Sequence, residues 1–169
     1  MILKTKRLVL RPFTIEDFEA VHVYAQDYDT CKYMLNLPSK TPEDTMKFLR
    51  RVEHDWSKDV ITCYEFAIVL DDAVIGAVSV EDWKETGVGE LGWVLNKTYQ
   101  GKGYALEAAS AVRDFAFDVL LYERLVAHCD ARNVGSYTLM ERIGMALVDD
   151  THTRVNKDGC VAQELEYSM

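Results

Sequence analysis

The chain has 169 residues, of which 49% are apolar and 28% charged, and its formal net charge is −9. This composition is typical of a globular α/β protein, and the length fits one domain, residues 1–169, with a sizeable core. The excess of acids argues against general nucleic-acid binding, and no apolar run approaches the roughly 18–20 residues of a membrane span.

The N-terminal segment and the cysteines indicate the compartment. Charges follow too early after Met1 for a signal peptide, so we expect a cytoplasmic protein. The cysteines lack a Cys-x-x-Cys pair, and the histidines lack metal-ligand spacing with them or with each other. We therefore expect no metal site and predict reduced, mostly buried thiols at Cys31, Cys63, Cys129 and Cys160.

The first third of the chain predicts one strand and two helices. Residues 6–13 alternate in polarity and are rich in β-formers, which predicts a strand. A helix should follow over 14–25, because its first residues read Thr-Ile-Glu-Asp, a capping-box pattern. Residues 28–40 are mixed and predict a loop with a short helical turn. The segment 41–56 begins Thr-Pro-Glu-Asp, a strong helix start.

The middle of the chain predicts an antiparallel meander of strands. Residues 63–70 and 74–80 are β-rich and are joined by Asp71-Asp72-Ala73, a hairpin signal. After a turn that ends in two glycines, residues 90–95 form the next predicted strand.

The last third alternates helices and strands. A wide apolar face predicts a helix over 103–118. The strand at 124–129 should lie parallel to the strand at 90–95, because a helix separates them. A helix over 136–143 should then lead to a terminal hairpin of residues 146–152 and 161–167. We predict an α/β fold whose mixed, mostly antiparallel sheet carries helices on both faces.

The segment Gln100-Gly101-Lys102-Gly103-Tyr104-Ala105 connects the strand at 90–95 to a helix. Such a glycine-rich turn leaves several backbone N–H groups unpaired beside the positive end of a helix dipole, which suits a phosphate or pyrophosphate. A P-loop would need Lys and Ser or Thr after Gly103, and a dinucleotide fingerprint would need glycine in place of Leu106. What remains is Gln-x-x-Gly-x-Ala.

This pattern resembles the acyl-coenzyme A pyrophosphate loop of the GNAT acetyltransferase superfamily. Residues 131–145 match the family's Asn-x-x-Ser segment, helix and closing Gly-Phe pair, with Met145 in place of Phe. Residues 5–11, Thr-Lys-Arg-Leu-Val-Leu-Arg, resemble the opening strand of the branch that includes the ribosomal-protein N-terminal acetyltransferases. The three segments occur in the family's order and together span nearly the whole chain.

The resemblance implies that the sheet splays apart between the strands at 90–95 and 124–129 and that acetyl-CoA, the cosubstrate, binds there. Its pantetheine amides would pair with the strand edge at 93–95, and its pyrophosphate would lie on the amides of 101–106. Lys102 is either a further phosphate contact or a solvated side chain. The predicted acetyl-CoA-binding residues are Trp93, Val94, Leu95, Gln100, Gly101, Lys102, Gly103, Tyr104, Ala105, Asn133 and Ser136.

The resemblance also implies roles for residues that follow the strand at 124–129. Asn133 would hydrogen-bond the pantetheine arm, and it is also a preferred helix N-cap, so both roles are open. Ser136 would donate a hydrogen bond to the leaving thiolate, with Tyr137 as the alternative donor. Cys129 lacks the context of a nucleophile and is expected to pack in the core.

Acetyl transfer to an amine requires the neutral amine. An α-amino group has a pKa near 7.7–8.0 and needs a weaker base than a lysine amine near 10.4. Glu90 begins the strand that precedes the proposed acetyl site and is the first candidate for the general base, with Glu81 and Asp82 as alternatives. All three could instead be solvated acids at strand ends.

The sequence therefore predicts an N-acetyltransferase that moves acetyl from acetyl-CoA to a primary amine by direct attack in a ternary complex. The segment 5–11 favours a protein N-terminus as acceptor, by analogy with the ribosomal-protein branch. The alternatives are a small amine, such as an antibiotic, polyamine or amino acid, and a non-catalytic acyl-CoA sensor. The expected partners are acetyl-CoA and the amine, with a homodimer left open, and neither nucleic acid nor a membrane.

Overall fold

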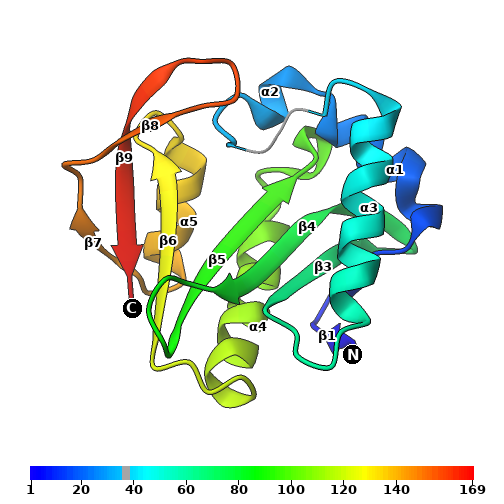
Figure 1. Ribbon diagram of the computed structural model, residues 1–169, viewed down its shortest axis with the longest axis horizontal. Helices are drawn as coiled ribbons and strands as arrows, with labels where there is room; N and C mark the ends of the chain where they lie inside the picture. The colour runs from blue at the N-terminus through cyan, green and yellow to red at the C-terminus, as the bar shows by residue number, and fades with distance from the viewer. Residues whose placement is uncertain (36–38) are drawn as a thin grey trace.

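The computed structural model describes residues 1–35 and 39–169 (Figure 1). Within them the chain forms a nine-stranded mixed sheet of order β1-β2-β3-β4-β5-β6-β9-β7, with β8 paired to β9. The strands are β1 (Leu3–Lys4), β2 (Val9–Pro12), β3 (Cys63–Leu70), β4 (Ala73–Asp82), β5 (Val88–Leu95), β6 (Arg124–Asp130), β7 (Ala146–Asp149), β8 (Thr153–Val155) and β9 (Val161–Ser168). The β5–β6 pair is parallel, as predicted, and the other described pairs are antiparallel.

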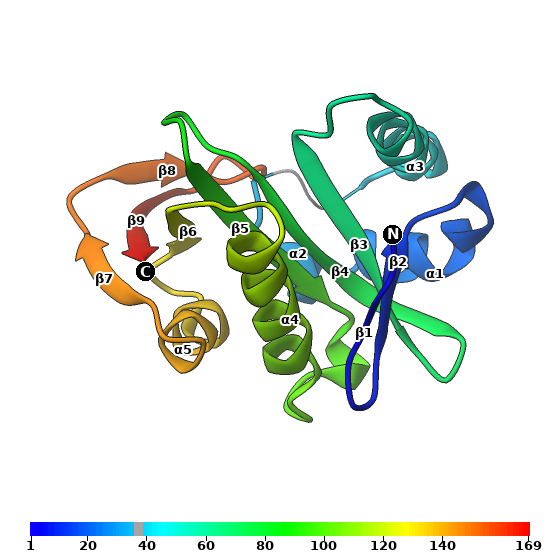
Figure 2. The ribbon, with the colours of Figure 1, turned by 90° about the horizontal axis from the view of Figure 1, so that it is seen from below.

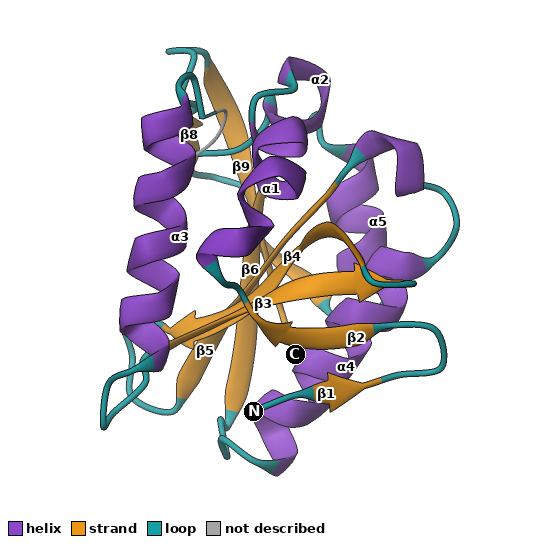
Figure 3. Cartoon of the chain, turned by 90° about the vertical axis from the view of Figure 1, so that its right-hand side faces the viewer, coloured by secondary structure: helices purple, strands orange, loops and turns teal. Residues whose placement is uncertain are grey.

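Helices cover both faces of this sheet, as predicted (Figure 2, Figure 3). They are α1 (Phe18–Ala25), α2 (Tyr28–Cys31), α3 (Pro42–Trp56), α4 (Tyr104–Asp118) and α5 (Val134–Arg142), with 3₁₀ turns η1 (Ile15–Asp17) and η2 (Lys97–Tyr99). Helices α1 and α3 lie on one face, against β4 and β3, and α4 and α5 lie on the other, against β4, β5, β6 and β9. Among the described residues, no helix is long and apolar enough to cross a membrane.

The two layers of helices explain the continuous apolar run in β3. Phe66 and Ile68 belong to the cluster beneath α4, whereas Ala67 and Val69 belong to the cluster beneath α1 and α3. Successive side chains of a strand point to opposite faces. A strand segment buried on both faces is therefore apolar at successive positions, as residues 66–69 are.

Local signals placed several elements correctly. Thr41 caps α3, since its hydroxyl accepts the Asp44 N–H at 3.2 Å. Thr14 is the N-cap of η1, and its N–H donates to the Asp17 carboxylate at 2.9 Å. Asp71 and Asp72 have φ values of 47° and 65°. Two consecutive residues with positive φ are typical of the type I′ turn that matches the twist of a hairpin.

The strand predicted over 6–13 is present as β2 over Val9–Pro12, but it begins later than predicted. The segment is part of a hairpin in which β2 begins at Val9 and the turn covers residues 5–8. The Thr5 N–H donates to the Leu8 carbonyl at 3.0 Å, and the Leu8 N–H donates to the Thr5 hydroxyl at 2.9 Å. These two local bonds turn the chain where the alternating pattern predicted extension.

The predicted terminal hairpin is confirmed, because β7 and β8 both run antiparallel to β9, but its first arm is interrupted. Residues 146–152 do not form one strand: β7 pairs with the C-terminal half of β9, and β8 pairs with its N-terminal half. Strand β9 thereby lies between β6 and β7. The break has a local cause, because the Asp149 carboxylate accepts both the N–H and the hydroxyl of Thr151 at 2.7 Å. Such a turn competes with a continuous strand.

Candidate active site

The sheet opens between its two parallel strands. Strand β5 pairs with β6 from Val88 to Glu90, and Glu90 lies opposite Val126; beyond this point the two strands diverge (Figure 1). Strand β5 continues alongside β4 as far as Leu95. The splay that the family resemblance implied is therefore present, and its apex is at Glu90.

Strand β5 presents a backbone edge to this opening. The Asn96 N–H donates to the Ile75 carbonyl of the β4 strand at 2.9 Å. Backbone groups alternate in direction along an antiparallel strand, so those of Leu95 and Trp93 face away from β4. The side chains of Trp93 and Val94 pack against the two core clusters. A ligand in the opening would thus meet backbone of β5.

The glycine loop follows β5 and leads into α4. Gly101 and Gly103 have φ values of 74° and 81°, in the left-handed region that favours glycine. Gly103 is the N-cap of α4, whose 15 residues supply a helix dipole. A Cβ at Gly101 would meet no described heavy atom within 4 Å. The loop thus leaves open space beside backbone donors, and its chemistry fits a pyrophosphate.

Side chains brace the loop from within. The Gln100 side chain donates through Nε2 to the Leu95 carbonyl at 2.8 Å, which ties the loop back to β5. Lys102 Nζ donates to the Thr98 carbonyl at 3.1 Å. Tyr99 and Tyr104 pack against the core.

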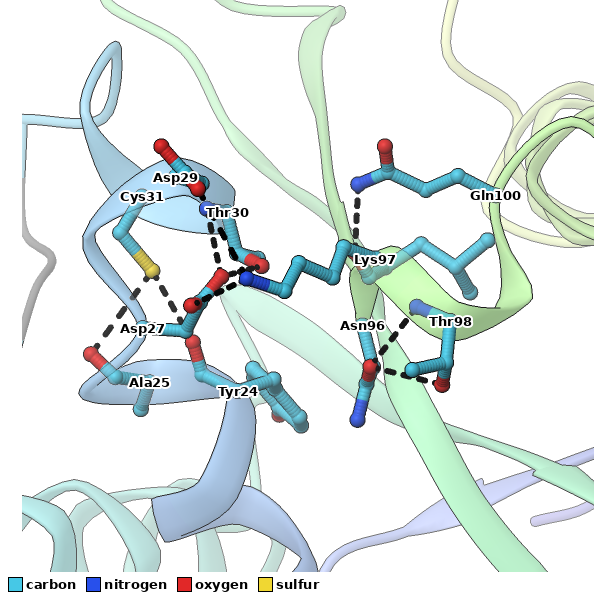
Figure 4. A network of polar contacts seen from close by, with 11 residues as sticks. Tyr24, Ala25, Asp27, Asp29, Thr30, Cys31, Asn96, Lys97, Thr98 and Gln100 are labelled. Carbon is cyan, nitrogen blue, oxygen red and sulfur yellow. Dashed lines mark hydrogen bonds and ion pairs between the residues drawn. The ribbon is translucent and has the colours of Figure 1, made fainter.

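A charged contact joins this region to α2 (Figure 4). Lys97 Nζ lies 2.9 Å from Asp27 Oδ1 and 3.7 Å from Asp29 Oδ2. A hydrogen bond from the Thr30 hydroxyl and the contact with Lys97 lower the pKa of Asp27 to about 2. The turn η2 that precedes the glycine loop is therefore fixed to the segment between α1 and α3.

On the other side of the opening, α5 begins just after β6. Asn133 is its N-cap, and its side-chain oxygen accepts the Ser136 N–H at 3.3 Å. Ser136 and Tyr137 are partly buried in the first turn. Cys129 is buried at the end of β6, and burial raises the pKa of its thiol to about 11. It is a packed thiol, as expected, and not an activated nucleophile.

Glu90 is held at the apex by His128, which no motif in the sequence marks as a site residue. His128 Nδ1 lies 2.6 Å from Glu90 Oε1, and His128 Nε2 lies 3.5 Å from Glu166 Oε2. The His128 side chain is 12% exposed and the Glu90 side chain is 21% exposed. The Trp83 ring lies 4.8 Å from the imidazole, centroid to centroid. The pairing follows from the parallel register, since Val126 is opposite Glu90 and residue 128 points to the same face.

The carboxylates around His128 change its pKa. Burial alone would lower this pKa, but the hydrogen bond and charge of Glu90 and the charges of Glu164 and Glu166 raise it. His128 is thus protonated more fully near neutral pH than a free histidine. The protonated imidazole stabilises the folded protein below the ordinary pKa of about 6.5, and this contribution is lost as pH rises through the raised value.

The two other candidate acids differ in position. Glu81 lies directly opposite Glu90 across β4 and β5, and burial together with the Glu90 charge raises its pKa. Asp82 is the next residue along β4, so it points to the opposite face, where it accepts a hydrogen bond from the Tyr122 hydroxyl. Glu81 remains an alternative base, whereas Asp82 faces away from Glu90. Within the described residues, no group of three or more His, Cys, Asp or Glu side chains could hold a metal ion.

A diverging sheet with a glycine loop at one strand end and an acid at the apex has the features of an acyl-CoA-dependent acyltransferase. Residues 7–146 match a family model described as an acetyltransferase (GNAT) domain. The chain therefore belongs to the GNAT acetyltransferase family.

Individual proteins agree with this assignment. The chain is 34% identical over 149 residues to the N-acetyltransferase YnaD of Bacillus subtilis strain 168, covering 86% of this chain and 82% of YnaD. A GNAT-family acetyltransferase structure from Bacillus anthracis has 30% identity and a TM-score of 0.83, covering 100% of this chain and 98% of that one. A structure of RimL, a ribosomal L7/L12 alpha-N-protein acetyltransferase with coenzyme A, shares the fold at 17% identity, with a TM-score of 0.85 and coverage of 100% and 97%.

The protein is thus an acetyl-CoA-dependent N-acetyltransferase. The alternative of a non-catalytic acyl-CoA sensor is not retained.

Proposed function

We propose that the acceptor is the α-amino group of a protein N-terminus, which attacks the thioester directly in a ternary complex. The observation that carries this proposal is the Glu90–His128 pair at the apex of the opening. An α-amino group, with a pKa near 7.7–8.0, needs a weak base, and a carboxylate at this position can serve. The fold shared with RimL, and the opening segment at residues 5–11, support the same acceptor class.

The face around Glu90 suits a cationic acceptor. Glu81 and Glu90 lie side by side on neighbouring strands, and Glu166 approaches from β9 on the other side of His128. Such a group of acids attracts an ammonium ion before it loses its proton. In its protonated form His128 donates to Glu90 Oε1, which leaves the second carboxylate oxygen for the amine.

The cosubstrate would supply the activated acetyl group from the opening between β5 and β6. The backbone of Trp93 to Leu95 would pair with its pantetheine amides, and the loop from Gln100 to Ala105 would hold its pyrophosphate. Asn133 would bind the pantetheine arm while it caps α5. Ser136 would donate its hydroxyl to the departing thiolate, with Tyr137 as the alternative donor.

Ser136→Ala is expected to lower kcat more than it weakens acetyl-CoA binding. The substitution removes a donor that matters when negative charge develops on sulfur, while the coenzyme contacts of the loop and of β5 remain. Release of coenzyme A thiol measures kcat, and calorimetry measures the dissociation constant. Tyr137→Phe is the matched comparison: if it abolishes turnover while Ser136→Ala keeps the parent rate, the donor is Tyr137.

The acceptor proposal is tested with a panel of amines. Coenzyme A release is compared for three groups of acceptors. These are peptides with free N-termini, the same peptides with acetylated N-termini and an internal lysine, and small amines. We expect the free N-termini to give the highest kcat/KM and the blocked peptides to give little turnover. A polyamine, amino acid or antibiotic that exceeds every peptide by tenfold or more would identify a small-molecule acetyltransferase instead.

A further inference from the structure

The turn between β1 and β2 reaches across the molecule to the first turn of α4. The Glu107 carboxylate accepts three hydrogen bonds from this turn: from the Thr5 hydroxyl at 2.6 Å, from the Arg7 N–H at 2.7 Å and from Arg7 Nε at 2.7 Å. Burial alone would raise the pKa of Glu107, but these donors lower it. Thr5 and Arg7 are thereby fixed at the helix end that carries the glycine loop.

Arg7 also contacts the loop itself. Its Nη1 donates to the Lys102 carbonyl at 3.0 Å, and its guanidinium lies 4.4 Å from the centre of the Tyr104 ring. The Lys102 carbonyl belongs to the peptide that joins Lys102 to Gly103. In a trans peptide the C=O and N–H point in opposite directions. A carbonyl held by Arg7 therefore aims the Gly103 N–H away from Arg7.

Arg7 further balances a charge at the helix end. A carboxylate in the first turn of a helix stabilises the helix, but it also offsets the positive potential that attracts an anionic ligand. The ion pair between Arg7 and Glu107 offsets the carboxylate charge. The amides at the start of α4 then face a bound anion without an uncompensated neighbouring charge.

We propose that Arg7 is a positioning residue for acetyl-CoA, which sets the direction of the loop amides that bind the pyrophosphate. The inference rests on the proposed role of the glycine loop. The inference assigns a function to residues 5–7, Thr-x-Arg, to which the acetyl-transfer mechanism assigns no role. The second arginine of that segment, Arg11, has a different partner, since it binds the Asp17 carboxylate at 2.7 and 2.8 Å.

The test compares Arg7→Gln and Arg7→Lys with Arg11→Lys as the matched control. We expect Arg7→Gln to raise the dissociation constant of coenzyme A, measured by calorimetry, at least fivefold. The KM for acetyl-CoA should rise in parallel, while kcat at saturation changes less than twofold. Arg7→Lys keeps the charge but lacks the planar fork that bonds Glu107 and the loop together, so it should be intermediate. Arg11→Lys should lower Tm without changing coenzyme A affinity.

Two results distinguish a failure of the Arg7 proposal from a failure of the loop assignment. If the Arg7 variants lower Tm yet bind coenzyme A within twofold of the parent, Arg7 is structural and the proposal is overturned. If Gly103→Val also binds normally, the assignment of the loop itself is wrong. Should Arg7→Gln fail to fold, the affinity of Arg7→Lys decides, because it keeps the charge at the helix end.

Discussion

Replacing Gly103 with valine is expected to weaken coenzyme A binding at least tenfold, which corresponds to about 1.4 kcal/mol. Gly103 has φ at 81°, where a β-branched residue is strained. Its new Cβ would lie 3.4 Å from Arg7 Nη2, and the methyl groups beyond it would press on the arginine or enter the space beside the loop amides. Either outcome disturbs the backbone donors that we assign to the pyrophosphate. Calorimetry with coenzyme A measures the change.

Backbone strain alone must be separated from damage to the site. Gly159 has φ at 84°, lies in the turn between β8 and β9, and a Cβ there would meet no described atom within 4 Å. Gly159→Val therefore introduces comparable strain away from the loop. It should lose stability and keep the parent affinity. A folded Gly103→Val protein with the parent affinity for coenzyme A would contradict the assignment of the loop.

Most of the features that the sequence predicts correctly depend on neighbouring residues. The Thr-Pro start of α3, the positive-φ turn at Asp71 and Asp72 and the glycines of the loop each follow from the conformational preferences of a few adjacent residues. The parallel pairing of β5 and β6 also followed, because a helix between two strands returns the chain to the same end of the sheet.

The missed turns at residues 5–8 and 149–151 are local, but the site contacts that the sequence did not predict join distant residues. His128 meets Glu90 across 38 positions, and Arg7 meets Glu107 across 100. Each contact requires both the strand order and the exact register. The same limit applies to β9, whose place between β6 and β7 is set by pairing along the whole sheet. Charge patterns within single segments carry no information about such neighbours.

The substitution Glu90→Gln is expected to lower the rate at pH 7 roughly 10²-fold, within the usual range for loss of a general base. Glutamine keeps the size and polarity of the side chain and can still contact His128, but it cannot accept the amine proton. At pH 7 most of an α-amino acceptor is protonated, since its pKa is near 7.7–8.0. The loss should therefore shrink at higher pH, where the acceptor is already neutral. Profiles of log(kcat/KM) against pH for both proteins, with one amine acceptor, measure the effect.

Two further variants locate the proton acceptor. His128→Gln removes the imidazole that holds Glu90 at the apex and should lower kcat/KM, because the Glu90 carboxylate is then less firmly positioned for the amine. Glu81→Gln removes the acid opposite Glu90 and should keep most of the parent kcat/KM. Parallel profiles for the parent and Glu90→Gln, with little separation between them, would show that Glu90 is a spectator. A large loss of kcat/KM in Glu81→Gln would then identify Glu81 as the base. If both variants keep the parent kcat/KM, the solvent accepts the amine proton.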